Sequence, residues 1–163
     1  MVGTNNNFSG GTRQAFRWTA ASGTVGLGFL PGGNDSSAGG VNAAGNVVVG
    51  ISNGTAGAYQ AFRWTAATGM VGLGFLPTAT ESGASRVSAD GKVVVGSSGG
   101  KAFRWTAGDG MQSIQDLLSA AGASGLTGWQ LTAATGISAS GKVISGQGID
   151  PLGRNQGWIA TLR

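Results

Sequence analysis

The chain has 163 residues, of which 33 are Gly, and it contains neither Cys nor His. It therefore cannot form disulfides, thiolate or imidazole metal sites, or Ser-His-Asp and Cys-His catalytic groups. Its 10 Lys and Arg residues exceed its 6 Asp and Glu residues, but they are scattered, whereas nucleic-acid binding needs clustered cations. We expect one domain that is not an enzyme, with no cofactor, no metal and no nucleic-acid partner.

The beginning of the sequence has no basic segment followed by an apolar run, so we expect no signal peptide within this chain. No run of about 18 apolar residues occurs either, so we expect no membrane span.

The stronger signal is internal repetition. Residues 14–31 (QAFRWTAASGTVGLGFLP) and 60–77 (QAFRWTAATGMVGLGFLP) are nearly identical and lie 46 positions apart. Further copies begin at Lys101 and, more weakly, at Gln156, and a second unit recurs at 41–50, 87–96 and 137–146.

Each module is expected to form four short strands in chain order. The first leads into Val41, Val87 or Ile137, and a turn that ends in Gly connects it to a β-branched run typical of a buried central strand. The third is Ala-Phe-Arg-Trp-Thr, and the fourth covers 25–29, 71–75 or 111–114. Four strands in about 40 to 50 residues predict a β-propeller blade, and a β-sandwich of duplicated hairpins is the alternative.

The predicted fold is thus an all-β, propeller-like array of four-stranded antiparallel blades in a single repeat domain, 1–163. Its modules are 1–30 (partial), 31–76, 77–131 and 132–163 (partial). In the third module, residues 113–122 place Ile114, Leu117, Leu118 and Ala121 on one helical stripe, and Gly122 can end the helix. We expect this short helix to pack on a blade edge, and binding of a partner is its alternative role.

The ends of the sequence provide too few strands to close a ring. Residues 1–30 supply at most three, including a weak one at 2–4, and residues 132–163 supply three. Both ends contain the same third strand, so they overlap and do not complete one blade. Because bare strand edges and apolar faces invite pairing, we expect a homo-oligomer or a piece of a longer array.

Arginine and tryptophan recur together in the third strand. Arg17, Arg63 and Arg104, with Trp18, Trp64 and Trp105, could form a multivalent site for sugars. The structural alternative is that each Arg lies between blades with its guanidinium bound to backbone carbonyls, and that the aromatic residues are core. These six residues are the candidate ligand-binding residues of the sequence.

Two carboxylates, Asp35 and Glu81, also lie 46 positions apart in equivalent loops. An acid/base pair requires two different environments, whereas equivalent positions should have matching ones, so we do not expect catalysis. Asp90 is expected to satisfy its own turn.

At QAFRWT, GLGFLP and VSADGKVVVG the chain resembles the bacterial extracellular repeat proteins called the HAF-repeat family, over essentially its whole length. The His of that family is replaced by Gln14, Gln60, Lys101 and Gln156 here, and the resemblance implies no catalytic residues. It implies secretion or display at a bacterial surface. We therefore expect a non-enzymatic extracellular module for protein–protein or self-association, with a surface protein or a glycan as a further partner. The alternative is a multivalent, lectin-like propeller.

Overall fold

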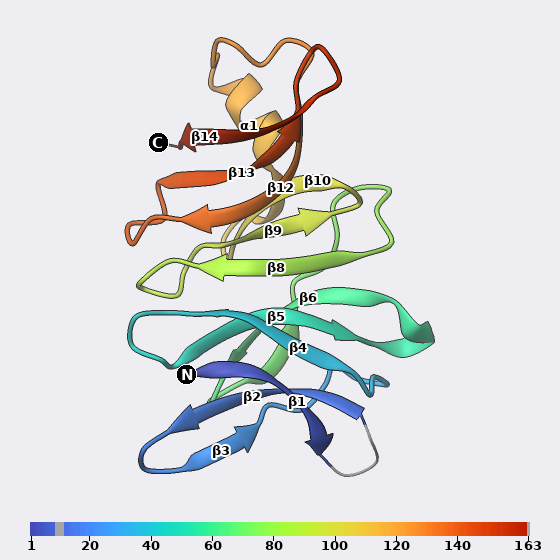
Figure 1. The fold of residues 1–163 in the computed structure, drawn as a ribbon, viewed down its shortest axis with the longest axis vertical. Helices are drawn as coiled ribbons and strands as arrows, with labels where there is room; N and C mark the ends of the chain where they lie inside the picture. The colour runs from blue at the N-terminus through green and yellow to red at the C-terminus, as the bar shows by residue number, and fades with distance from the viewer. Residues whose placement is uncertain (9–11, 163) are drawn as a thin grey trace.

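The computed structural model describes residues 1–8 and 12–162. They form strands β1 to β14, one α-helix and one short 3₁₀-helix, and the strands make four antiparallel sheets. Figure 1 shows these sheets along the long axis in chain order, from the N-terminal sheet at the bottom to the C-terminal sheet at the top. The prediction of an all-β array of antiparallel sheets with one short helix is confirmed.

The two sheets at the ends have three strands each, and the two between them have four. Sheet 1 contains β1 (Val2–Phe8), β2 (Thr12–Thr19) and β3 (Gly23–Gly26). Sheet 2 contains β4 (Ser36–Val41), β5 (Val47–Asn53), β6 (Tyr59–Thr65) and β7 (Gly69–Gly72), with the 3₁₀-helix η1 (Thr55–Gly57) before β6. Sheet 3 contains β8 (Ser82–Val87), β9 (Val94–Ser98), β10 (Lys101–Thr106) and β11 (Gly110–Ser113), followed by helix α1 (Ile114–Ala120). Sheet 4 contains β12 (Gln130–Ile137), β13 (Val143–Ile149) and β14 (Asn155–Thr161), and so begins just before the expected module boundary at 132.

The turn between the first two strands is the same in sheets 2, 3 and 4. A polar side chain at its start accepts a hydrogen bond from the backbone N–H at the start of the next strand, and a Gly with positive φ completes the reversal. The bonds are Val47 N to Asn42 Oδ1, Val93 N to Ser88 Oγ and Val143 N to Ser138 Oγ, each of 3.0 Å, and the glycines are Gly45, Gly91 and Gly141. These residues explain why the β-branched run that follows always begins a new strand.

The second strands of sheets 2 and 3 are central and buried on both faces, as predicted. Val48, Val49, Val94 and Val95 have no exposed surface, and Val47 is also buried. The stiff β-branched side chains fill the space between neighbouring sheets without a large loss of rotamer freedom.

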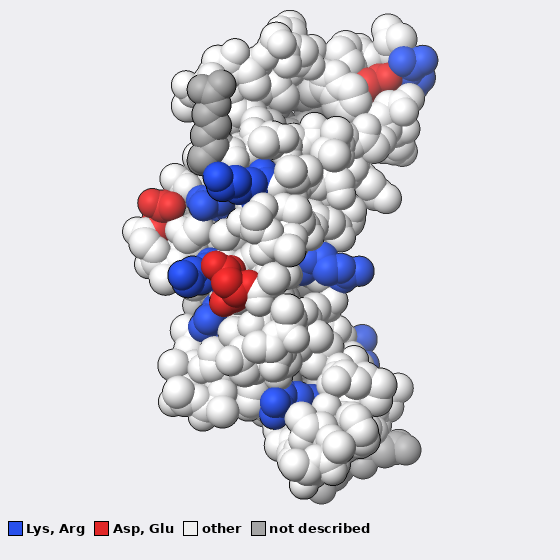
Figure 2. All heavy atoms as spheres, turned by 90° about the vertical axis from the view of Figure 1, so that its left-hand side faces the viewer, with Lys and Arg blue, Asp and Glu red and all other residues white. Residues whose placement is uncertain are grey.

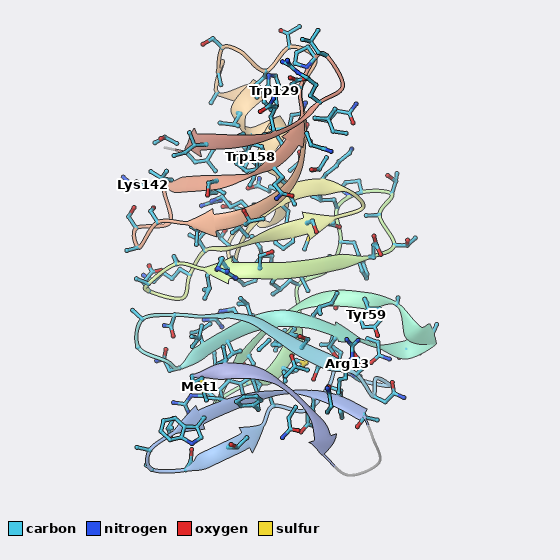
Figure 3. All side chains as sticks on the ribbon, in the orientation of Figure 1. Met1, Arg13, Tyr59, Trp129, Lys142 and Trp158 are labelled. Carbon is cyan, nitrogen blue, oxygen red and sulfur yellow. The ribbon has the colours of Figure 1, made fainter. Side chains whose placement is uncertain are left out.

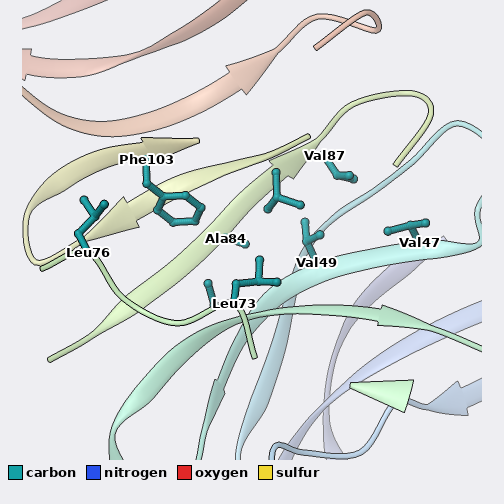
Figure 4. Close-up of a cluster of buried hydrophobic side chains, with 9 residues drawn as sticks. Val47, Val49, Leu73, Leu76, Ala84, Val87 and Phe103 are labelled. Carbon is teal, nitrogen blue, oxygen red and sulfur yellow. The ribbon is translucent and has the colours of Figure 1, made fainter. Parts of the chain in front are cut away.

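Alternate residues of the third strand face opposite neighbours. Ala61 belongs to a cluster built from sheets 2 and 3, which includes Val49, Leu73, Ala84 and Phe103 (Figure 4). Its neighbour Phe62 belongs to a cluster built from sheets 1 and 2, with Ala15, Leu27 and Leu30. Sheets 2 and 3 therefore each present a Phe face to the preceding sheet and an Ala face to the following one, and the corresponding faces of sheets 1 and 4 take the same names below.

Helix α1 is slightly shorter than the predicted 113–122. Ser113 caps it, because its Oγ accepts a hydrogen bond from Asp116 N at 3.2 Å, and Gly122 follows its end at φ +70°. Ile114 and Leu118 are buried in the cluster that joins sheets 3 and 4. The helix therefore packs its apolar side onto the sheets, as the first interpretation of this segment expected.

Two details of the prediction need correction. The fourth strands β3 and β7 end at Gly26 and Gly72 and do not continue to 29 and 75, because Gly28 (φ +78°) and Gly74 (φ +81°) turn the chain out of the extended conformation. Near the N-terminus, the strand expected at 2–4 is longer and extends to Phe8 as β1.

The expected shortage of strands is confirmed at both ends. Sheet 1 lacks a counterpart of the first strands β4, β8 and β12, and sheet 4 lacks a counterpart of the fourth strands β3, β7 and β11. Sheets 1 and 4 lie at opposite ends of the molecule in Figure 1. The described residues thus form an open array and not a closed ring.

Candidate functional site

The arginines of sheets 1 and 2 each bind the following sheet. Arg17 Nε donates a 2.6 Å hydrogen bond to the carbonyl of Gly45, and Arg63 Nε donates one of 3.2 Å to the carbonyl of Gly91. Both carbonyls belong to the turn after the first strand of the next sheet. These are the contacts that the structural interpretation of the arginines expected, since a partly buried guanidinium needs acceptors.

Arg104 differs from the other two. Its Nη1 lies 3.5 Å from Oδ2 of Asp109, a residue of the turn that follows its own strand. The corresponding positions in the earlier copies are Ser22 and Thr68, whose side chains bond to Thr19 and Thr65 within the turn. The three arginines therefore do not form a uniform set of free guanidinium groups.

The tryptophans lie on the opposite face of the strand from the arginines. Trp64 and Trp105 pack against buried clusters that each face the preceding sheet. Trp18 occupies the same position in sheet 1, where the described chain has no preceding sheet, and it is 42% exposed. Because Arg and Trp of one module point to opposite sides, they do not line one common pocket.

The two equivalent carboxylates have different surroundings, contrary to the expected match. Both oxygens of Asp35 accept hydrogen bonds from Arg13, from Nε and Nη2, at 2.9 Å each. This carboxylate raises the pKa of Arg13 above its ordinary value. Glu81 is exposed, and the residue at the position of Arg13 in its module is Tyr59. Figure 3 shows Arg13 and Tyr59 close together on one side of the molecule. The asymmetry follows from the absence of the guanidinium, since Tyr59 cannot form the bidentate ion pair that Arg13 forms with Asp35.

Asp90 satisfies its own turn, as predicted. Its Oδ1 accepts hydrogen bonds from Ser88 Oγ at 2.6 Å and from Lys92 N at 3.0 Å. The bond from Ser88 is the main reason that the pKa of Asp90 lies below its ordinary value.

Buried serines join the sheets, although they are not among the residues predicted from the sequence. Ser36 Oγ accepts from Ala15 N at 3.0 Å and donates to the Gly28 carbonyl at 2.7 Å. Ser82 makes the same pair of bonds, with Ala61 N at 2.9 Å and the Gly74 carbonyl at 2.7 Å. The repeat spacing could have identified them, because Ser36 and Ser82 also lie 46 positions apart in the sequence.

The junction between sheets 3 and 4 uses a different residue. There, Gln115 of α1 donates to the Trp129 carbonyl at 2.7 Å and accepts from Leu131 N at 3.1 Å. The helical insert thus supplies polar contacts where the first two junctions use serine.

The charged groups on the face drawn in Figure 2 are not concentrated at one place. On the face drawn in Figure 2, basic groups lie at separate levels of the stack with uncharged surface between them, and acidic groups lie beside some of them. Within residues 1–8 and 12–162, no group of three or more His, Cys, Asp and Glu side chains is placed to hold a metal ion. In the same residues, no helix has the length and apolar character needed to cross a membrane.

The remaining candidate surfaces are the two ends of the array. At the N-terminal end, the Phe face of sheet 1 carries Phe16 and Trp18. At the C-terminal end, the outward face of sheet 4 carries Ile159, which is 75% exposed, and a groove of about 500 Å³ lies between β14 and the segment after α1.

Comparison with known proteins bears on the fold alone. No protein-family model and no curated protein matches the chain. Among solved structures, the chain is similar to TolB from Acinetobacter baumannii, with a TM-score of 0.62 and 13% sequence identity over 99% of this chain. The chain spans 38% of the length of that protein. The described sheets are therefore similar to the β-propeller domain of TolB, although they form an open array. The resemblance to the HAF-repeat family stays a prediction.

Proposed function

We propose that the chain is a non-enzymatic repeat module whose work is protein association, in the first place with a second copy of itself, through the exposed Phe face of sheet 1. On the family resemblance, we further propose that it acts outside a bacterial cell.

The observation that carries the proposal is the exposure of this face. Phe62 and Phe103, in sheets 2 and 3, have no exposed surface, because a preceding sheet covers each of them. Phe16 is only half-buried and Trp18 is 42% exposed, although the sequence around them is the same. An exposed face with the composition of a core face is typical of an interaction surface.

The contacts within the chain indicate which surface fits the Phe face. Between sheets 1 and 2, Phe62 packs with Ala15 of β2 and with Leu27 and Leu30, which follow β3. The corresponding face of sheet 4 is uncovered in the described chain, and it carries Gly157 and Ile159 at the positions of Ala15 and Arg17. These residues supply small and apolar surface without a charge. One end of a copy can therefore pack on the opposite end of another, in a heterologous contact that builds chains of copies.

The carbohydrate-binding alternative has no comparable support. Arg17 and Arg63 are already bonded to carbonyls, and each Trp lies on the other side of its strand. Replacing Arg17, Arg63 and Arg104 together by Gln tests this alternative, since it predicts lost retention on glycan supports at unchanged stability.

Sedimentation velocity over a range of concentrations tests the proposed association. We expect the mass of the natural chain to rise above the 16.0 kDa of a monomer as concentration increases. Trp18→Ser should shift this rise to at least about tenfold higher concentration, which corresponds to about 1.4 kcal/mol. Leu152→Ser is the matched control, because Leu152 is 74% exposed but lies in a hairpin loop. A natural chain of 16.0 kDa at every concentration, or equal effects of the two substitutions, would overturn the proposal.

A further inference from the structure

Strand β14 has an open edge at the place where the other three sheets have a fourth strand. It pairs with β13 on one side, and no strand of the described residues pairs with its other side. Its counterparts β2, β6 and β10 each pair with a fourth strand, which is β3, β7 or β11. The chain thus contains three examples of what occupies this edge.

The backbone groups on that edge are identifiable. Leu162 N donates to the Lys142 carbonyl at 2.8 Å, so the even-numbered residues at the end of β14 direct their N–H and C=O groups toward β13. The alternation of a strand then directs the groups of Gly157, Ile159 and Thr161 toward the open edge. In β6, the equivalent of Gly157 is Ala61, and its carbonyl accepts a 2.8 Å bond from Leu73 N just after the fourth strand.

This edge lacks the features that usually prevent strand addition. Proteins blunt exposed edges by short length, charge or Pro. The outer strands β3, β7 and β11 are four residues each, whereas β14 has seven, with the sequence NQGWIAT and no charged residue or Pro. A long, uncharged edge is suited to pairing with another chain.

A groove of about 500 Å³ runs along the same edge. Residues 157–161 form one wall, and the other wall comes from α1 and the segment after it, chiefly Leu118, Leu126 and Trp129. Position 160 is Ala here, whereas the preceding copies have Trp18, Trp64 and Trp105. The small side chain leaves room that a Trp would fill, so a large apolar side chain from a neighbouring strand fits there.

Which residue of an added strand would enter the groove follows from β7. Met70 pairs with Trp64 and packs with it in the cluster between sheets 1 and 2. Since Ala160 is the counterpart of Trp64, the counterpart of Met70 would lie against Ala160 and Trp158, on the side of the groove.

We propose that the β14 edge binds an extended segment of another polypeptide as the fourth strand of sheet 4, with the pattern Gly-x-Val-Gly-Leu and a large apolar residue at x. Backbone hydrogen bonds along the edge supply affinity, and the groove selects the residue at x. The inference deepens the proposed association function and rests on it for its biological meaning, but it concerns the backbone edge of sheet 4 and not the Phe face of sheet 1.

The test uses a fluorescently labelled synthetic peptide with the sequence of residues 69–77, GMVGLGFLP, and the full chain. We expect saturable binding by fluorescence anisotropy. Ile159→Pro removes an N–H on the open edge without removing a bond to β13, and it should weaken binding at least about tenfold. Ile159→Ala, which keeps that N–H, is the matched control and should stay within about threefold. A peptide with Pro in place of Val71 should fail to bind, because its central residue can no longer donate to the edge.

A second peptide keeps the test decisive if Ile159→Pro does not fold. A peptide with Ser in place of Met70 keeps the backbone groups but has no large apolar side chain for the groove, so it should bind at least about tenfold more weakly. Absence of peptide binding to the natural chain, or equal binding of the natural and the Met70→Ser peptides, would overturn the inference. So would equal binding of the Val71→Pro peptide. Self-association that depends on Trp18 is measured separately, so failure at the β14 edge and failure of the proposed function are distinguishable.

Discussion

Sheets 1 and 2 contain the same strand sequence, Gln-Ala-Phe-Arg-Trp-Thr, in two different surroundings. In sheet 2, Phe62 is fully buried between sheets, whereas in sheet 1 Phe16 is half-buried and Trp18 is 42% exposed. The arginines of the two strands make the same contact with the next sheet. Position in the array, and not local sequence, therefore decides whether the Phe face is core or surface.

The sharpest way to test this comparison is to truncate the two phenylalanines. Phe62→Ala should lower the free energy of unfolding by about 3–5 kcal/mol, because it leaves a cavity in a closed interface. Phe16→Ala, the matched substitution in sheet 1, should cost about 1 kcal/mol, because water already reaches that face. Urea denaturation measures both values. Equal losses would mean that sheet 1 is covered as fully as sheet 2.

Loss of a buried serine should destabilise the junction of sheets 1 and 2 and the junction of sheets 2 and 3 to a similar extent. Ser82→Ala leaves Ala61 N–H and the Gly74 carbonyl without their partner, and it should cost about 1–3 kcal/mol in unfolding free energy. Ser36→Ala should cost a similar amount, because its two bonds are the same. Ser119→Ala, on the exposed side of α1, is the control and should change stability by less than about 0.5 kcal/mol. A negligible effect of Ser82→Ala would contradict a structural role for the serines.

Substitution of an arginine should lower stability more at the first two junctions between sheets than at the third. Arg63→Gln removes the bond to the Gly91 carbonyl and should cost about 1 kcal/mol. Arg104→Gln removes only an ion pair with the exposed Asp109, so the expected cost is about 0.5 kcal/mol or less. Thermal denaturation of both variants gives the comparison. A larger loss for Arg104→Gln would show that it holds sheet 4 in place after all.

The carboxyl group of Asp150, which follows β13 of sheet 4, should contribute to the pH dependence of stability. Hydrogen bonds from Arg154, and a further one from Leu152 N, lower the pKa of the Asp150 carboxyl. A carboxyl with a lowered pKa in the folded state stabilises the fold above its ordinary pKa of about 4, and this contribution is lost as the pH falls from there through the folded-state pKa. Asp150→Asn should therefore reduce the loss of stability between about pH 5 and pH 2. Denaturation at several pH values checks this, and an unchanged acid slope would argue against it.

Repetition made most of the fold predictable from the sequence. The repeated units, which begin 41 to 55 residues apart, located the strands, their turns and the incomplete end modules, and the apolar stripe at Ile114 and Leu118 located the helix. The extent of β3 and β7 was not predictable in this way, because a Gly such as Gly28 permits both extended and left-handed backbone.

The candidate site was harder to infer for a physical reason. Adjacent residues of a strand face opposite sides, so Arg17 and Trp18 are neighbours in the sequence but their side chains do not share a site. The asymmetry between Asp35 and Glu81 arises from Arg13, a residue outside the repeated segment. The groove beside β14 depends on Ala160 in the weakest copy, where the repeat pattern carries least information.

Hydrogen exchange of the natural chain, followed by mass spectrometry, tests the central claim most directly. Peptides that cover 12–19 and 59–65 report on β2 and β6, which are both central strands of their sheets. In dilute solution, β6 should exchange much more slowly than β2, because one face of sheet 1 is uncovered and opens at a lower free energy. Protection of β2 should then rise with protein concentration as its Phe face is covered by a second copy. Equal protection of the two strands in dilute solution would contradict the account.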